Sequence, residues 1–216
     1  MKITKVLSYQ VLDSRGKPTV AAAISLADGS THTARVPSGA STGKHEALEL
    51  RDGNQSISNR YYSGNSVNLA VANINSKIAP ALVGREVSLH TVDEQIREID
   101  SSVSRKGLGA NATLAVSLAG AKAEAHSKNQ SLARFFTPTG NLLLPMPMVN
   151  ILSGGAHANR TLDIQDVLVL PHGATSFSEA LSWIVAIREL AAVRGREKGL
   201  VTHLVADEGG LGIPFD

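Results

Sequence analysis

The feature that most constrains the fold of this chain is a change of pattern around "TPTGN", residues 137–141. Before these residues, three strand-like segments are followed by a series of helical ones. After them, strand-like and helical segments alternate. Strands followed by helices are typical of an α+β domain, whereas alternation with apolar strands favours parallel pairing. The sequence therefore predicts an α+β domain over residues 1–136 and the beginning of a second, alternating domain over residues 142–216.

The first domain begins with three segments of strand character. Residues 3–13 alternate between apolar and polar side chains, residues 18–26 are apolar and partly β-branched, and residues 31–37 return as a third strand. Asp28-Gly29, between the last two segments, is a strong signal for a tight hairpin turn. The pattern predicts a three-stranded antiparallel meander.

Apolar residues at helical spacing begin after the meander. One of the predicted helices is interrupted by Pro80, and Thr91 and Glu94 have the spacing of a capping box at the start of another. In the second domain, Ser176 and Glu179 have the same spacing at the start of a long amphipathic helix. The expected helices are residues 67–84, 91–100, 111–128, 131–136 and 176–199.

Composition excludes several classes of function. The formal net charge is +2, and the Lys and Arg residues form no run longer than Arg105-Lys106, which argues against nucleic-acid binding. The absence of cysteine excludes a disulfide scaffold and a thiolate metal site, and it suits a reducing cytoplasm. The N-terminus becomes polar too early for a signal peptide, and no apolar run reaches membrane-spanning length. We expect a soluble cytoplasmic protein that does not bind nucleic acid and has no membrane-spanning segment.

A run of small residues, "SGASTG" (residues 38–43), follows the third strand. A P-loop needs four residues between its glycines and a Ser or Thr after its lysine, but here three residues separate Gly39 from Gly43, and His45 follows Lys44. This spacing argues against a nucleotide loop. Two interpretations stay open: the hydroxyls and amides of the run could close over an anion or a metal as a lid, or the run could be an ordinary surface turn.

Three side chains of the second domain are candidates for chemistry. His157 follows a strand-like segment and Gly154-Gly155, Asp166 opens the apolar run "DVLVL", and Glu208 follows a strand-like run in "VADEGG". A carboxylate beside an apolar strand needs a partner, and one at the carboxyl end of a strand can hold a metal or act as a general acid. The alternatives are a structural or exposed role for His157 and a helix cap for Glu208.

Six stretches, spread along essentially the whole chain, occur in a characteristic order. They are "LDSRGKPTV", "VPSGASTGKHEALELRDG", "GANATLAVSLAGAKA", "LPMPMVNILSGGAHA", "DIQDVLVLP" and "VADEGG". In this order they resemble the enolase (phosphopyruvate hydratase) family. The resemblance implies an α+β N-terminal domain with a three-stranded antiparallel meander plus helices, followed by a (β/α)8 barrel of which this chain holds the first strands and helix. It also implies the reversible dehydration of 2-phosphoglycerate, a small phosphorylated three-carbon acid, to phosphoenolpyruvate in glycolysis, with Mg²⁺ as cofactor.

The resemblance assigns roles to five residues. Glu208 matches the acid that helps to expel the C3 hydroxyl, and His157 matches a histidine on a mobile loop beside the substrate. Gln165 matches a substrate-contacting glutamine, and Ser41 matches the lid serine that coordinates the second Mg²⁺. Asp166 stands where the family has a catalytic-site glutamate, whose arm is one methylene longer, and a displacement of about 1 Å at a site can be costly.

Several parts of the family's site have no counterpart in this sequence. The carboxylate ligands of the first Mg²⁺, the lysine that takes the C2 proton and the phosphate-binding groups are expected further along such a protein, whose barrel needs about 250 residues. We therefore expect this chain to correspond to the N-terminal half of an enolase and to be inactive by itself. The alternative is a non-catalytic binding or regulatory protein, or a relic, derived from an enolase. Ala21 replaces a glutamate that the family associates with its dimer contact. The resemblance implies a homodimer, and this replacement weakens that prediction.

Overall fold

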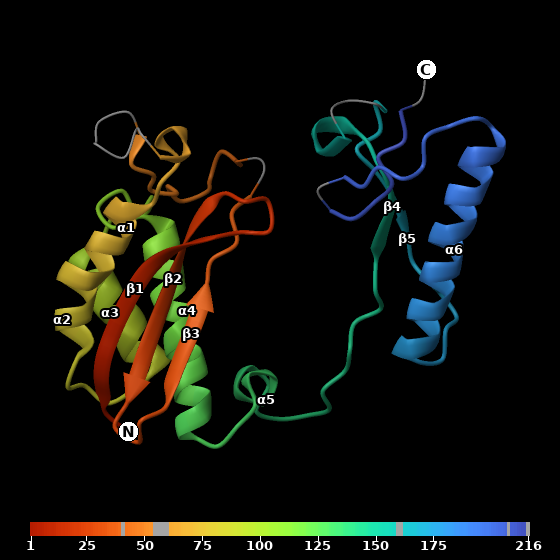
Figure 1. Ribbon diagram of the computed structural model, residues 1–216. Helices are drawn as coiled ribbons and strands as arrows, with labels where there is room; N and C mark the ends of the chain where they lie inside the picture. The colour runs from red at the N-terminus through yellow and green to blue at the C-terminus, as the bar shows by residue number, and fades with distance from the viewer. Residues whose placement is uncertain (40–41, 54–60, 159–161, 207, 215–216) are drawn as a thin grey trace. The chain divides into compact units, whose positions relative to one another are not determined.

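The computed structural model describes residues 1–39, 42–53, 61–158, 162–206 and 208–214. The chain divides into two compact units, Met1–Gly140 and Asn141–Asp216 (Figure 1).

A three-stranded antiparallel sheet forms one layer of the unit Met1–Gly140. Its strands are β1 (Ile3–Leu12), β2 (Pro18–Leu26) and β3 (Thr31–Arg35) in the order β1-β2-β3, so the predicted meander is confirmed. The central strand β2 is buried along most of its length, which accounts for its continuous apolar run, whereas exposed residues interrupt the buried ones along β1. Gly29 adopts a φ of 86° in the turn between β2 and β3, as the Asp28-Gly29 signal predicts.

Helices cover one face of this sheet (Figure 1). Three consecutive helical segments over residues 68–82 pack on β1, the long helix α4 (Ala110–Ser127) packs on β2 and β3, and α3 (Leu89–Ile99) packs on α4. A π-helical turn comes shortly before Pro80, which has no N–H for the regular helical bond. Buried apolar side chains from both layers form one core. The helical segments are η3 (Tyr62–Gly64), α1 (Asn68–Asn73), the π-turn η4 (Ile74–Ile78), α2 (Ala79–Leu82), α3 (Leu89–Ile99), α4 (Ala110–Ser127) and α5 (Leu132–Phe136).

The start of α3 differs from the prediction. Its N-cap is Ser88, whose Oγ accepts a hydrogen bond from the N–H of Thr91 at 3.5 Å, so the predicted start at Thr91 is wrong. The N–H of Leu89 also donates to Glu124 of α4 at 2.6 Å. This contact between two helices helps to fix the first turn of α3, and the local spacing of Thr91 and Glu94 does not reveal it.

The unit Asn141–Asp216 contains β4 (Val149–Ser153), the 3₁₀ helix η5 (Gly155–Ala158), β5 (Asp166–Val169) and α6 (Phe177–Glu197). The strands β4 and β5 pair antiparallel. The parallel pairing predicted from the sequence concerns strands on the two sides of the long helix, and β4 and β5 both precede that helix. A parallel connection needs a long crossover, usually with an α-helix, and among the described residues between these strands only the short η5 is helical. The helix α6 follows β5 instead, and beyond it Leu211 forms a parallel bridge with Leu152 of β4.

The long helix α6 begins where the sequence predicts. Ser176 is its N-cap and accepts a hydrogen bond from the N–H of Glu179 at 3.2 Å. The Glu179 carboxylate accepts from the N–H and the hydroxyl of Thr175 at 2.6 and 2.7 Å, one residue further back than in the usual capping box. In the part of the chain that the structure describes, no helix has both the length and the apolarity required to cross a bilayer.

The turn between β2 and β3 is tied to α4 by titratable side chains. His126 Nε2 lies 2.9 Å from Asp28 Oδ2, and the ring centroids of His126 and His32 lie 4.6 Å apart. Burial, followed by the charge of His126, lowers the pKa of His32 from its ordinary value of 6.5. The hydroxyl and the N–H of Ser30 donate to Asp28 and, together with His126, lower the pKa of that carboxyl.

We expect these shifts to make the attachment of α4 dependent on pH. Because the unfolded chain binds a proton on His32 at a higher pH than the folded chain does, stability should fall as the pH drops below about 6.5. Asp28 should add a further loss below about 3.8, since its folded pKa is lowered. The measurement is the opening free energy of α4 from amide hydrogen exchange at pH 7 and pH 5.5.

The variant His32→Gln should flatten this dependence. The matched control is His90→Gln on α3, where the His90 side chain is exposed and pairs with Glu94, and it should keep the slope of the parent chain. A slope that survives in His32→Gln would contradict the assignment.

Candidate active site

The end of β4 is fastened to the segment that leads into β5. The N–H of Gly154 donates to the carbonyl of Gln165 at 2.7 Å, and the N–H of Gly155 donates to the carbonyl of Leu162 at 2.8 Å. A Cβ at position 154 would lie 2.1 Å from the carbonyl oxygen of Ile164, so only glycine permits this approach. The helix η5, which contains His157, therefore starts beside the backbone of Gln165. The side chain of His157 lies outside the described part of the structure.

Glu208 lies in a tight turn and is exposed. The N–H of Ala206 donates to the carbonyl of Gly210 at 2.9 Å, and Val205 pairs with Leu211 in an antiparallel bridge. The expected strand over "THLVADEGG" is therefore reduced to a single bridge residue, Val205. The chain reverses here because Gly209 adopts a φ of 84°.

This turn is held against β4. The N–H of Leu211 donates to the carbonyl of Ile151 at 2.8 Å, and the N–H of Ser153 donates to the carbonyl of Leu211 at 3.0 Å. The turn that carries Glu208 and the helix that carries His157 thus both attach to the carboxyl end of β4. His157 and Glu208 are about fifty residues apart in the sequence, so their spacing does not predict that the two segments meet.

Asp166 is the first residue of β5 and is half-buried. Its Oδ1 accepts a hydrogen bond from Asn150 Nδ2 at 2.5 Å, and the same Nδ2 donates to Ser153 Oγ at 2.9 Å. The partner that we expect for a carboxylate beside an apolar strand is therefore an amide of β4. Asn150 is not among the site residues predicted from the sequence, although a polar residue inside the apolar run "MVNIL" is the signal that could have indicated it.

Gly210 connects this cluster to the turn that carries Glu208. A Cβ at position 210 would lie 2.5 Å from Ser153 Oγ and 2.8 Å from Asn150 Oδ1. The backbone therefore passes directly against Asn150 two residues after Glu208. Within this unit, the structure brings together the segments that carry His157, Gln165, Asp166 and Glu208 around the end of β4.

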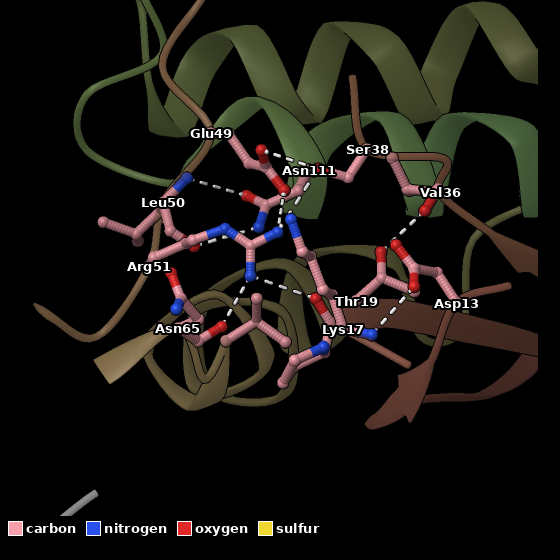
Figure 2. A network of polar contacts seen from close by, with 12 residues as sticks. Asp13, Lys17, Thr19, Val36, Ser38, Glu49, Leu50, Arg51, Asn65 and Asn111 are labelled. Atoms are coloured by element: carbon pink, nitrogen blue, oxygen red, sulfur yellow. Dashed lines mark hydrogen bonds and ion pairs between the residues drawn. The ribbon is translucent and has the colours of Figure 1, made fainter. Parts of the chain in front are cut away.

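The other sequence-predicted segment, residues 38–43, begins at a polar network centred on Arg51 (Figure 2). The Arg51 guanidinium donates to Glu49 Oε1 at 2.7 Å, to Ser38 Oγ at 3.3 Å and to the carbonyls of Pro18 and Asn65 at 3.1 and 2.5 Å. Ser38 Oγ also donates to Glu49 Oε2 at 3.1 Å. The guanidinium thus joins four segments of the chain. Its bond to Ser38 holds the first residue of the small-residue run in place.

Residues 48–50 are attached to the start of α4. Asn111 accepts a hydrogen bond from the N–H of Leu50 at 3.1 Å and donates to the carbonyl of Leu50 at 2.9 Å (Figure 2). The N–H of Ala110 donates to the carbonyl of Leu48 at 2.7 Å. A cavity of about 260 Å³ lies beside this attachment. It is lined by Val36, Pro37, Ser38, Gly39, Glu46, Ala47, Glu49, Ala110, Asn111 and Leu114. Ser41 lies outside the described residues.

The described part of the chain does not contain a ligand set that fits a divalent cation. No group of three or more His, Asp or Glu side chains is placed there to hold a metal ion. No chemical step is therefore assigned to a metal held by these residues.

Comparison with known proteins gives the family. The model of the enolase N-terminal domain matches residues 3–136, and the model of the enolase C-terminal TIM barrel domain matches residues 141–215. The chain belongs to the enolase family. Its fold is accordingly an enolase N-terminal domain followed by part of the TIM barrel domain, as the resemblance predicts.

Individual enolases are similar over nearly the whole chain. The enolase of Tropheryma whipplei (strain Twist) is 46% identical over 210 residues, which cover 97% of this chain and 48% of that relative. The enolase of Campylobacter jejuni subsp. jejuni serotype O:23/36 (strain 81-176) is 44% identical over 212 residues, which cover 97% and 49% respectively. The chain therefore spans about half the length of the curated relatives it matches.

Ala21 is fully buried in the central strand β2, where it pairs with Tyr9 of β1 and Arg35 of β3. A carboxylate at this position would have to be paired to be tolerated. A small apolar side chain can be buried here without a partner, which explains why alanine suits position 21. The homodimer stays a prediction.

Proposed function

We propose that this chain supplies one half of an enolase-type lyase, which reversibly dehydrates 2-phosphoglycerate to phosphoenolpyruvate and water in cytoplasmic glycolysis. Residues 1–136 and 142–216 would be its two domains. The observation that supports this proposal most strongly is the convergence at the end of β4. The segments of His157, Gln165 and Asp166 and the turn of Glu208 are joined there by backbone hydrogen bonds or by Asn150.

In the proposed reaction, a base removes the C2 proton of the substrate, and the C3–O bond then breaks. Hydroxide is a poor leaving group, so Glu208 donates its proton to the departing oxygen and water is formed. Gln165 and His157 contact the substrate, and Asp166 provides a fixed negative charge beside them. Glu208 suits the role of acid because its turn is exposed and can be reached by a ligand.

The base and most of the cationic groups are proposed to come from elsewhere. Loss of the C2 proton places a second negative charge on an anionic group, and Mg²⁺, if bound there, would supply the electrostatic stabilisation that this charge needs. The described residues offer no set of Mg²⁺ ligands. Ser41, which lies outside them, would supply one hydroxyl ligand to Mg²⁺. We therefore assign the principal ligands, the base lysine and the phosphate-binding groups to the half of the relatives that this chain does not span.

Exposed apolar side chains in the unit Asn141–Asp216 support the need for that second half. The helix α6 exposes Trp183, Val185 and Leu190, which are 40%, 55% and 54% accessible, and β5 exposes Leu168, which is 43% accessible. Apolar surface of this extent is typical of a face that another part of a protein covers. The remaining barrel strands and helices of the relatives are the covering segment we propose.

A two-part assay tests the proposal. The purified 216-residue chain is incubated with Mg²⁺ and 2-phosphoglycerate, alone and together with the part of the Tropheryma whipplei enolase that the chain does not match. We expect no turnover above background for either part and measurable formation of phosphoenolpyruvate by the mixture. Turnover by the chain alone would refute the need for a second half. A stable complex of the two parts without turnover would refute the proposed reaction.

A non-catalytic binding or regulatory protein is the second candidate. It is favoured by the hydrogen bond between Asp166 and Asn150, which occupies one oxygen of a carboxylate that already stands on a shorter arm than the family's glutamate. A soluble, monodisperse chain that fails to bind the complementary half would favour this function. Aggregation of the chain alone would favour the enolase half, because an incomplete sheet exposes edges and an apolar face.

A further inference from the structure

Asn150 is a buried polar residue whose hydrogen bonds are only partly satisfied. It lies in β4 and is 8% exposed. In the described part of the chain, its Oδ1 is a buried side-chain atom without a hydrogen-bond partner. An unsatisfied buried acceptor destabilises the folded state, and an apolar residue of similar shape avoids this cost. Stability of the fold therefore does not explain why the chain has an asparagine here.

The amide group of Asn150 has one orientation that fits its neighbours. The side-chain NH₂ donates to Asp166 Oδ1 at 2.5 Å and to Ser153 Oγ at 2.9 Å. An ionised carboxylate can only accept hydrogen bonds, so the NH₂ must face Asp166 and Oδ1 must face away from it. The unsatisfied Oδ1 thus follows from the contact between Asn150 and Asp166.

The opposite side of Asn150 contacts the turn that carries Glu208. A Cβ at position 210 would lie 2.8 Å from Asn150 Oδ1, so the backbone of Gly210 fits directly against the amide. The adjoining Leu211 is hydrogen-bonded to Ile151 and Ser153 of β4. One buried side chain therefore lies between the carboxylate of Asp166 and the turn of Glu208.

We propose that Asn150 is a positioning residue that holds the Asp166 carboxylate in a single orientation relative to the Glu208 turn. An aspartate side chain has two torsions, and one strong hydrogen bond to one oxygen leaves it little freedom. The contact between Asn150 and Asp166 is given directly by the structure. Its consequence for catalysis rests on the proposed function, since Asp166 and Glu208 act there in the same reaction.

The first test is solution NMR on the 216-residue chain. In the parent chain, the Hα–Hβ couplings of Asp166 should report one rotamer. Asn150→Asp has nearly the same shape but replaces the donor by a second carboxylate, and it should give couplings averaged over several rotamers. Asn111→Asp changes another buried asparagine, in the other unit, and should leave the Asp166 couplings unchanged. Couplings that are the same in the parent chain and Asn150→Asp would overturn the proposal.

A second variant covers the case in which Asn150→Asp does not fold. Asp166→Ala removes the acceptor and leaves Asn150 in place. The side-chain amide protons of Asn150 should then shift upfield and exchange faster with solvent than in the parent chain. Unchanged amide resonances would overturn the proposal.

The two-part assay separates this inference from the proposed function. Asn150→Asp should lower kcat about 10²-fold with little change in KM, because it displaces a group at the reacting centre rather than a substrate contact. An unchanged kcat together with averaged Asp166 rotamers would overturn the role of Asn150 in catalysis. Absence of turnover in the parent mixture would count against the proposed function, and the NMR couplings would still decide whether Asn150 holds Asp166.

Discussion

Glu208→Gln should lower the rate of dehydration by the two-part enzyme about 10²- to 10⁴-fold, which is the usual contribution of a general acid. Glutamine keeps the size and the polar character of the side chain but has no proton of suitable acidity to give to the departing C3 hydroxyl. The tight turn over residues 206–210 and its attachment to β4 depend on backbone bonds, so they should persist in the variant. The measurement is kcat for phosphoenolpyruvate formation, with KM determined in parallel.

Glu189→Gln is the matched control for this experiment. Glu189 is an exposed residue of α6 in the same unit, and its replacement removes the same charge without touching the turn. The control should retain the activity of the parent mixture. A Glu208→Gln enzyme with the parent rate would exclude Glu208 as the acid and would leave the helix-cap interpretation as its role.

Gly154→Ala should destabilise the unit Asn141–Asp216 by about 3 kcal/mol or more. The new methyl group would lie 2.1 Å from the carbonyl oxygen of Ile164 and 2.7 Å from that of Leu162. Both contacts are with backbone, so no side chain can rotate away to relieve them. The chain must instead break the bond between the Gly154 N–H and the Gln165 carbonyl, which separates η5 from the start of β5. Urea denaturation followed by fluorescence of Trp183, the one tryptophan of the chain, measures the loss.

Gly212→Ala distinguishes this clash from the general effect of replacing a glycine. A Cβ at position 212 would meet its nearest neighbours at 3.7 Å or more, which is ordinary van der Waals contact. We expect its unfolding midpoint to stay close to that of the parent chain. Equal midpoints for Gly154→Ala and Gly212→Ala would contradict the close approach at the end of β4.

Much of the first unit could be predicted because its information is local. The Asp28-Gly29 turn and the apolar character of residues 18–26 predict neighbouring antiparallel strands, and these are the strands observed. The cap of α6 at Ser176 is likewise set by residues within one turn of helix. The start of α3 could not be predicted in this way, because Leu89 is held by Glu124, a residue 35 positions away.

The candidate site was predicted only in part. The resemblance names His157, Gln165, Asp166 and Glu208, but it does not provide the contacts that join their segments. Asn150 and Gly210 were missed because their importance depends on a contact between residues 60 positions apart. The strand expected before Glu208 was wrong, since hydrogen bonds to distant segments decide the backbone conformation there.

The order of residues by itself determined most of the strand and helix segments, where the pattern changes near residue 140, and which family the chain resembles. These properties follow from side-chain periodicity and from turn residues, which act over a few positions. Only the tertiary structure decided that Asn150 lies between Asp166 and the turn of Glu208. The roles of Asn150 and Gly210 depend on close packing between two segments of the chain. Close packing is set by distances in space, which a linear sequence does not specify.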